Sequence, residues 1–149
     1  MLFRSREQLL PIPAGWEHDY WCLLVAAGIG SAINVLPRPL ARYRQHSGQV
    51  IGGKRTILQR WEFAERQSLE SRSREAERWG LLRDRLAGRG GKAEAIALVE
   101  AKRAHLLRRS RFPRARGLRL AFVFMEWLRG GYGRYDAGLS SAVKDILSS

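Results

Sequence analysis

Two segments in the first third of the chain carry residue types that could do chemistry on a phosphorylated substrate. Residues 16–21 read Trp-Glu-His-Asp-Tyr-Trp, and residues 42–52 begin Arg-Tyr-Arg-Gln-His. Asp19 can accept a proton, and Arg42 and Arg44 can bind phosphate oxygens through their paired N–H groups. Each residue taken alone also fits an ordinary role. A carboxylate at a helix start is commonly a cap, and arginines on an edge strand discourage pairing with other strands.

The first segment is predicted to lie at the beginning of a helix. The pattern of residues 17–27 is helical, and Gly28 and Gly30 are expected to end it. Asp19 would then lie in the first turn, where the helix dipole favours a negative charge. Residues 1–15 are expected to be irregular because two prolines and a glycine interrupt them.

The second segment is predicted to lie on a small β-hairpin. Residues 33–36 and 40–46 are β-prone and are separated by a proline-rich turn. In an extended strand, alternate side chains share a face, so Arg42, Arg44 and His46 would point the same way. The usual alternative for such a face is simple exposure to solvent.

The rest of the chain is predicted to be helical. Apolar residues recur near helical spacing in four further stretches, residues 56–86, 92–109, 116–129 and 140–147. A glycine-rich break separates the first two of these stretches. The chain is therefore expected to be mostly α, with one small β-hairpin.

The charge of the chain implies an anionic partner. Among its 149 residues, 27 Lys and Arg outnumber 14 Asp and Glu, and residues 102–119 hold eight basic residues and no acidic one. Nucleic acid, an acidic membrane surface or a phosphorylated ligand could each supply the negative charge. Nucleic acid is disfavoured because no recognised binding motif is present and aromatic residues do not interleave with the basic block.

Composition also bears on the compartment of the protein. A single cysteine, Cys22, excludes an internal disulfide. The N-terminus lacks the apolar core of a secretory signal, and the most apolar run, residues 118–128, is too short to span a bilayer. We therefore expect a cytoplasmic protein that is at most peripheral at the inner face of the membrane.

The order of these motifs resembles the C-terminal part of family 2 glycosyltransferases. Many bacterial members, including rhamnosyltransferase-like ones, carry His-Asp-Trp-Trp and then Pro-x-Pro-Leu-x-x-Tyr-Arg-Gln-His-Gly-x-Asn-x-x-Gly. Residues 18–21 read His-Asp-Tyr-Trp, and residues 37–52 match the second pattern except for Ser-Gly-Gln in place of Gly-x-Asn. Residues 128–135 and 138–147 resemble the end of the same group. The resemblance runs, with gaps, from about Gly15 to the last residue.

The resemblance implies an α/β fold of GT-A type, of which this chain is the C-terminal portion. Such an enzyme moves a sugar, with inversion, from a nucleotide-sugar donor to a hydroxyl of a saccharide or lipid-linked acceptor, in cell-surface polysaccharide or glycolipid synthesis. The resemblance implies that Asp19 is the general base and that Arg42 and Arg44 bind the donor diphosphate. It also implies that His18 and Trp21 contact the acceptor or sugar and that His46 is a ligand for Mg²⁺ or Mn²⁺.

One absence shapes the expected organisation. GT-A enzymes bind the nucleotide through an N-terminal βαβ region and a metal-binding Asp-x-Asp, and none of the four aspartates here forms that motif. We therefore expect residues 1–53 to be the end of a catalytic domain and residues 54–149 to be a helical extension. The isolated chain would be truncated and inactive without a separate N-terminal half. The alternative is a basic helical module, without catalysis, that docks on a membrane surface or a partner.

Overall fold

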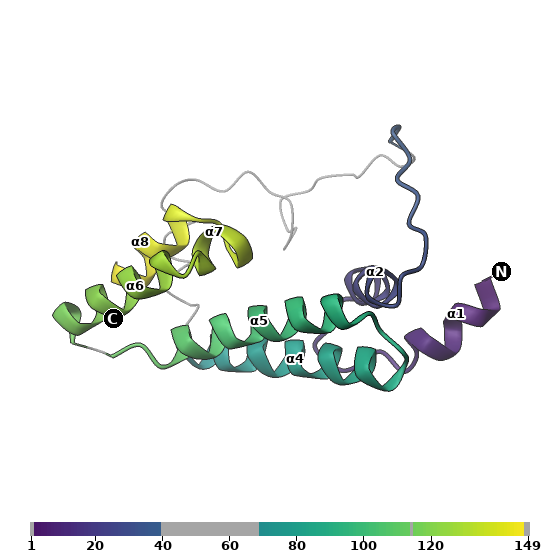
Figure 1. The fold of residues 1–149 in the computed structure, drawn as a ribbon, viewed down its shortest axis with the longest axis horizontal. Helices are drawn as coiled ribbons and strands as arrows, with labels where there is room; N and C mark the ends of the chain where they lie inside the picture. The colour runs from purple at the N-terminus through teal and green to yellow at the C-terminus, as the bar shows by residue number, and fades with distance from the viewer. Residues whose placement is uncertain (1, 40–68, 114, 148–149) are drawn as a thin grey trace, which may run out of the picture.

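The computed structural model describes residues 2–39, 69–113 and 115–147, and these are mostly helical (Figure 1). The helices are α1 (Leu2–Leu9), α2 (His18–Gly28), α4 (Leu69–Gly88), α5 (Ala93–Ser110), α6 (Arg116–Leu128), α7 (Gly131–Tyr135) and α8 (Leu139–Leu147). These three ranges contain no strand. The prediction of a mostly α chain is confirmed for this part, and none of its helices is both long and apolar enough to cross a membrane.

The two longest helices, α4 and α5, lie side by side and form the base of the molecule (Figure 1). The turn between them contains Gly90 with a φ of +71°, a left-handed conformation that glycine adopts without strain. The N–H of Gly91 closes the end of α4 by donating to the carbonyl oxygen of Leu86 at 2.7 Å. This turn confirms the break predicted at the glycine-rich segment.

A first core joins α2 to the α4–α5 pair. Its buried side chains are Trp21, Val25, Leu82, Leu86 and Val99. Residues on both sides of the predicted division at 53/54 therefore share one core. The core forms because α2 is apolar over most of its length and buries one stripe against two neighbouring helices.

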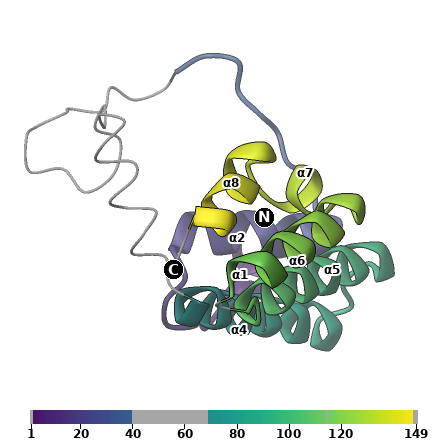
Figure 2. The ribbon, with the colours of Figure 1, turned by 90° about the vertical axis from the view of Figure 1, so that its left-hand side faces the viewer.

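The last three helices pack together against the C-terminal half of α5 and beyond its end. Phe112, Val123, Tyr132 and Ala142 form a second core there. Figure 2, viewed from that end, shows α7 and α8 above the α4–α5 pair. The chain is thus organised as a helical pair with a smaller helical cluster at each end.

The prediction of an irregular N-terminus is wrong for residues 2–9, which form α1. The prolines and the glycine lie beyond Leu9, so nothing within the helix itself opposes helical structure. Arg85 of α4 fixes the residues just after α1 by donating to the carbonyl oxygens of Leu10 and Pro11, both at 2.8 Å. Such a tether between distant segments is invisible to local sequence patterns.

The short helix α7 was also not predicted, because its sequence, Gly-Tyr-Gly-Arg-Tyr, reads as a helix end. Tyr132 explains the difference, since its ring is fully buried and its hydroxyl donates to Asp145 of α8 at 2.7 Å. Residues 33–36 are not in a strand. Their predicted partner, residues 40–46, and residues 56–68 of the predicted long helix lie outside the described residues.

Candidate functional site

The first turn of α2 presents the predicted catalytic carboxylate to solvent. The helix begins after Glu17, whose backbone is extended, and both His18 and Asp19 are exposed. The carboxylate of Asp19 accepts a hydrogen bond from the backbone N–H of Tyr20 at 2.8 Å. This N–H is one of the groups that a helix start leaves without a helical partner, so Asp19 also stabilises the helix end.

Trp21, predicted to contact an acceptor or a sugar, is instead a core residue. Its side chain is 0% exposed, and its indole Nε1 donates to the carbonyl oxygen of Leu9 at 2.8 Å. The buried ring presents no surface to a ligand in this structure. It holds α2 in the orientation that leaves the carboxylate of Asp19, two residues earlier, in solvent.

The predicted phosphate and metal ligands, Arg42, Arg44 and His46, lie outside the described residues. Within the described part, no three His, Cys, Asp or Glu side chains lie close enough together to hold a metal ion. The Mg²⁺ or Mn²⁺ site therefore stays a prediction, and the described residues supply no step that passes through it.

A pocket of about 490 Å³ opens beside the N-terminal end of α2. Its walls come from the segment before α2 and from α2, α4, α5 and α7. The lining residues are Trp16, Glu17, Tyr20, Leu24, Glu75, Arg78, Trp79, Leu98, Val99, Lys102, Arg134 and Tyr135. Asp19 is not among them, because the residues of α2 that line the pocket follow one helical stripe and Asp19 lies off that stripe.

Aromatic rings and cations give this pocket its chemical character. The ring of Trp16 lies 5.8 Å from that of Tyr20 and 5.9 Å from that of Trp79. The guanidinium of Arg78 lies 5.9 Å from the Trp16 ring, and Lys102 lies 5.9 Å from the Trp79 ring. Flat apolar faces beside charged groups suit a ligand that has both a ring and an anionic group. Local sequence patterns do not predict this pocket because its walls are far apart in the chain.

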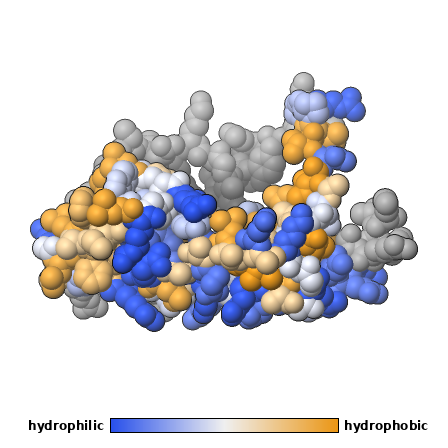
Figure 3. Space-filling model, in the orientation of Figure 1, coloured by the Kyte–Doolittle hydropathy of each residue, from blue (hydrophilic) through white to orange (hydrophobic). Residues whose placement is uncertain are grey.

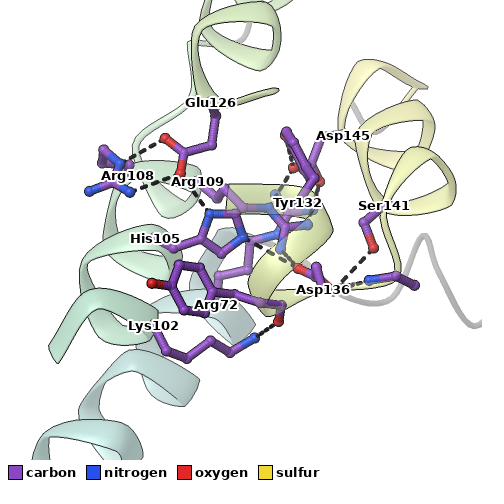
Figure 4. Close-up of polar contacts among 12 residues, drawn as sticks. Arg72, Lys102, His105, Arg108, Arg109, Glu126, Tyr132, Asp136, Ser141 and Asp145 are labelled. Carbon is purple, nitrogen blue, oxygen red and sulfur yellow. Dashed lines mark hydrogen bonds and ion pairs between the residues drawn. The ribbon is translucent and has the colours of Figure 1, made fainter. Parts of the chain in front are cut away.

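A buried ion-pair cluster joins the C-terminal helices to α4 and α5 (Figure 4). The fully buried carboxylate of Asp145 accepts from Arg109 at 2.6 and 3.0 Å and from the Tyr132 hydroxyl at 2.7 Å. Arg72 of α4 donates to the same carboxylate, and Arg109 also pairs with Asp136 of the α7–α8 connection. One α8 carboxylate therefore binds groups from three other helices.

A second part of the cluster surrounds Glu126 of α6, which is 1% exposed. Arg108 donates to its carboxylate through Nε and Nη2, at 2.7 and 2.8 Å. The Nδ1 atom of His105 lies 2.7 Å from the same carboxylate, and its Nε2 atom lies 3.6 Å from Asp136. His105 thus lies between the two carboxylates and links α6 to the α7–α8 connection.

Ion pairing offsets the cost of burying these charges. Burial alone would raise the pKa of Glu126, but hydrogen bonds from Arg108 and His105 outweigh it, and the net pKa is lowered. Burial would also raise the pKa of Asp136, but its contacts with His105 and Arg109 lower the net pKa well below its ordinary value. Burial would lower the pKa of Arg109, yet its bonds to Asp145 raise the net value. The two carboxylates are thus held in their charged form.

The centre of the cluster is closed to solvent, whereas Arg108 and Asp136 at its edge are partly exposed. The side chains of His105 and Asp145 are 0% exposed, so a substrate has no access to them in this structure. One sequence signal could have indicated part of it. Glu126 is the only acidic residue between positions 101 and 135, and it lies in an otherwise apolar stretch. Such a charge is buried only with a partner.

No protein-family model, no curated protein and no solved structure matches the chain.

Proposed function

We propose that the chain is the C-terminal part of a glycosyltransferase of GT-A type. It would transfer a sugar, with inversion, from a nucleotide-sugar donor to an acceptor hydroxyl. The order of the two motifs and of the C-terminal segment supports this proposal. The observation that carries it is the arrangement of the first motif, in which the buried ring of Trp21 anchors α2 and the carboxylate of Asp19 is exposed at its first turn.

The proposed chemistry is a single displacement. The acceptor oxygen attacks the anomeric carbon, the carboxylate of Asp19 takes the hydroxyl proton, and the bond to the diphosphate breaks with its electron pair on the phosphate oxygen. No covalent intermediate with the protein forms, so inversion follows. Arg42 and Arg44 would neutralise the departing diphosphate, and the exposed His18 would contact the acceptor.

The segment after α2 supports an origin in an α/β protein. Among residues 31–39, the apolar side chains of Ile33, Val35 and Leu36 are exposed, and Val35 is 86% exposed. A run of β-prone residues that is buried on both faces is typical of a parallel sheet with helices on each side. Exposure of these side chains fits a segment that would become a strand only beside neighbours from another part of the protein.

The test is a transfer assay with an Asp19→Asn variant. Membranes from cells that express the complete gene would be given radiolabelled UDP-glucose, GDP-mannose or dTDP-rhamnose, and label in the lipid and polysaccharide fractions would be counted. Loss of the base should lower transfer about 100-fold or more, with donor affinity unchanged. Asp84→Asn is the matched control because Asp84 is also an exposed helical aspartate. Equal transfer by the Asp19→Asn variant and the wild type would overturn the proposal.

A further inference from the structure

Helix α6 buries two of its charged side chains, Arg119 and Glu126, and exposes most of its apolar ones. Arg119, Val123 and Glu126 face the protein and are at most 5% exposed. Arg119 is satisfied by a bond from its Nε to the carbonyl oxygen of Pro113 at 2.8 Å, and Glu126 belongs to the buried ion-pair cluster. An ordinary surface helix of a globular protein shows the opposite arrangement.

The exposed side of α6 is almost continuously apolar. We call this surface the apolar face, and its residues are Leu118, Leu120, Phe122, Phe124, Met125, Trp127 and Leu128, each between 43% and 64% exposed. Figure 3 shows hydrophobic side chains gathered at the end of the molecule where α6 and α8 lie. Helix α8, which packs on α6, adds two more exposed apolar side chains, Leu139 and Val143, beside the exposed Ser140 and Lys144.

The charges around the apolar face are positive. Arg111 and Arg116 are exposed at the start of α6, and Arg129 is exposed just beyond its end. The only acidic residue between positions 101 and 135 is Glu126, which is buried and paired with Arg108. The apolar face is therefore bordered at both ends by exposed cations.

We propose that α6 lies in the headgroup region of an anionic lipid membrane, with its apolar face toward the acyl chains. Its 13 residues span roughly 20 Å, less than the thickness of the hydrocarbon core, so the helix would lie parallel to the surface. The arginines at its ends would pair with anionic headgroups. A second copy of the chain is the less suitable occupant because it would bring two sets of arginines together.

This inference goes beyond sugar transfer, since it depends on neither Asp19 nor a donor. It gives the chain a location at which a lipid-linked acceptor would be presented. The two proposals can therefore fail independently.

The experiment is co-sedimentation of the full chain with vesicles. Binding is expected to vesicles of equal parts phosphatidylglycerol and phosphatidylcholine, to weaken with added salt, and to be much weaker to phosphatidylcholine alone. A Leu120→Gln/Phe124→Gln variant removes two side chains one turn apart on the apolar face and should bind about tenfold more weakly, or worse. The matched control, Leu23→Gln/Leu81→Gln, alters similarly exposed residues on α2 and α4 and should bind like the wild type.

A charge variant separates the electrostatic contribution to vesicle binding from the contribution of the apolar face. Arg111→Glu/Arg116→Glu should weaken binding to the anionic vesicles at least fivefold for each residue, because each cation near such a surface contributes on the order of 1 kcal/mol. Circular dichroism would establish that each variant keeps the helical content of the wild type. Trp127→Phe should abolish any blue shift of tryptophan emission that vesicles produce.

Three results would overturn the inference. The wild-type chain could fail to bind anionic vesicles, or the apolar-face variant could bind them as tightly as the wild type. Light scattering could instead show a dimer that the Leu120→Gln/Phe124→Gln variant abolishes, with no vesicle binding. That last result would assign the apolar face to a second copy.

Discussion

Replacing Asp145 by asparagine should destabilise the protein strongly. The change keeps the shape of the side chain but removes a charge that is 0% exposed and bonded to Arg109, Arg72 and Tyr132. The two guanidinium groups would remain buried without their shared carboxylate. Removing one partner from a buried ion pair costs about 3–5 kcal/mol. That loss is a large part of the roughly 5–15 kcal/mol that stabilises a typical domain.

Urea denaturation followed by circular dichroism would measure the effect as a change in the free energy of unfolding. The melting temperature should fall on the order of 10 °C for a chain of this length. Asp84→Asn is the control, because the Arg83–Asp84 pair has a similar distance, 2.7 Å, but an exposed carboxylate. That pair should contribute at most about 1 kcal/mol. A loss below 1 kcal/mol for Asp145→Asn would refute the argument that the cluster stabilises the fold.

Two further predictions concern the same region. Gly131→Ala should lower the free energy of unfolding by about 1–3 kcal/mol, because the added Cβ would overlap Glu126 and His105. The control is Gly133→Ala in the same helix, whose added Cβ meets no other atom; in thermal melts it should be neutral or stabilising. The free energy of unfolding should also fall as the pH drops below about 4.5. The pKa values of Glu126 and Asp136 are lowered in the folded protein, so as the pH falls these carboxylates take up protons in the unfolded chain before they do so in the folded one. Urea titrations from about pH 6 to pH 3 should show a shallower decline for Glu126→Gln than for the wild type; equal slopes would contradict this account.

The sequence by itself determined where most helices of the described part begin and end. The stretches predicted at residues 17–27, 92–109, 116–129 and 140–147 match α2, α5, α6 and α8 to within one or two residues. Helical spacing of apolar side chains and breaks at glycine are local signals, and they act over a few residues. The position of Asp19 in the first turn of a helix is a local property of the same kind.

Only the tertiary structure decided which charged and aromatic side chains are buried. Asp145 pairs with Arg109, 36 residues away, and with Arg72, 73 residues away, and no local pattern encodes such distances. The same holds for Trp21, whose indole is bonded to Leu9 and buried against α4 and α5. Burying a charge is tolerated only when the fold delivers a partner to it. The contacts between helices therefore explain why α6 faces the protein with Arg119 and Glu126 and leaves its apolar face outside.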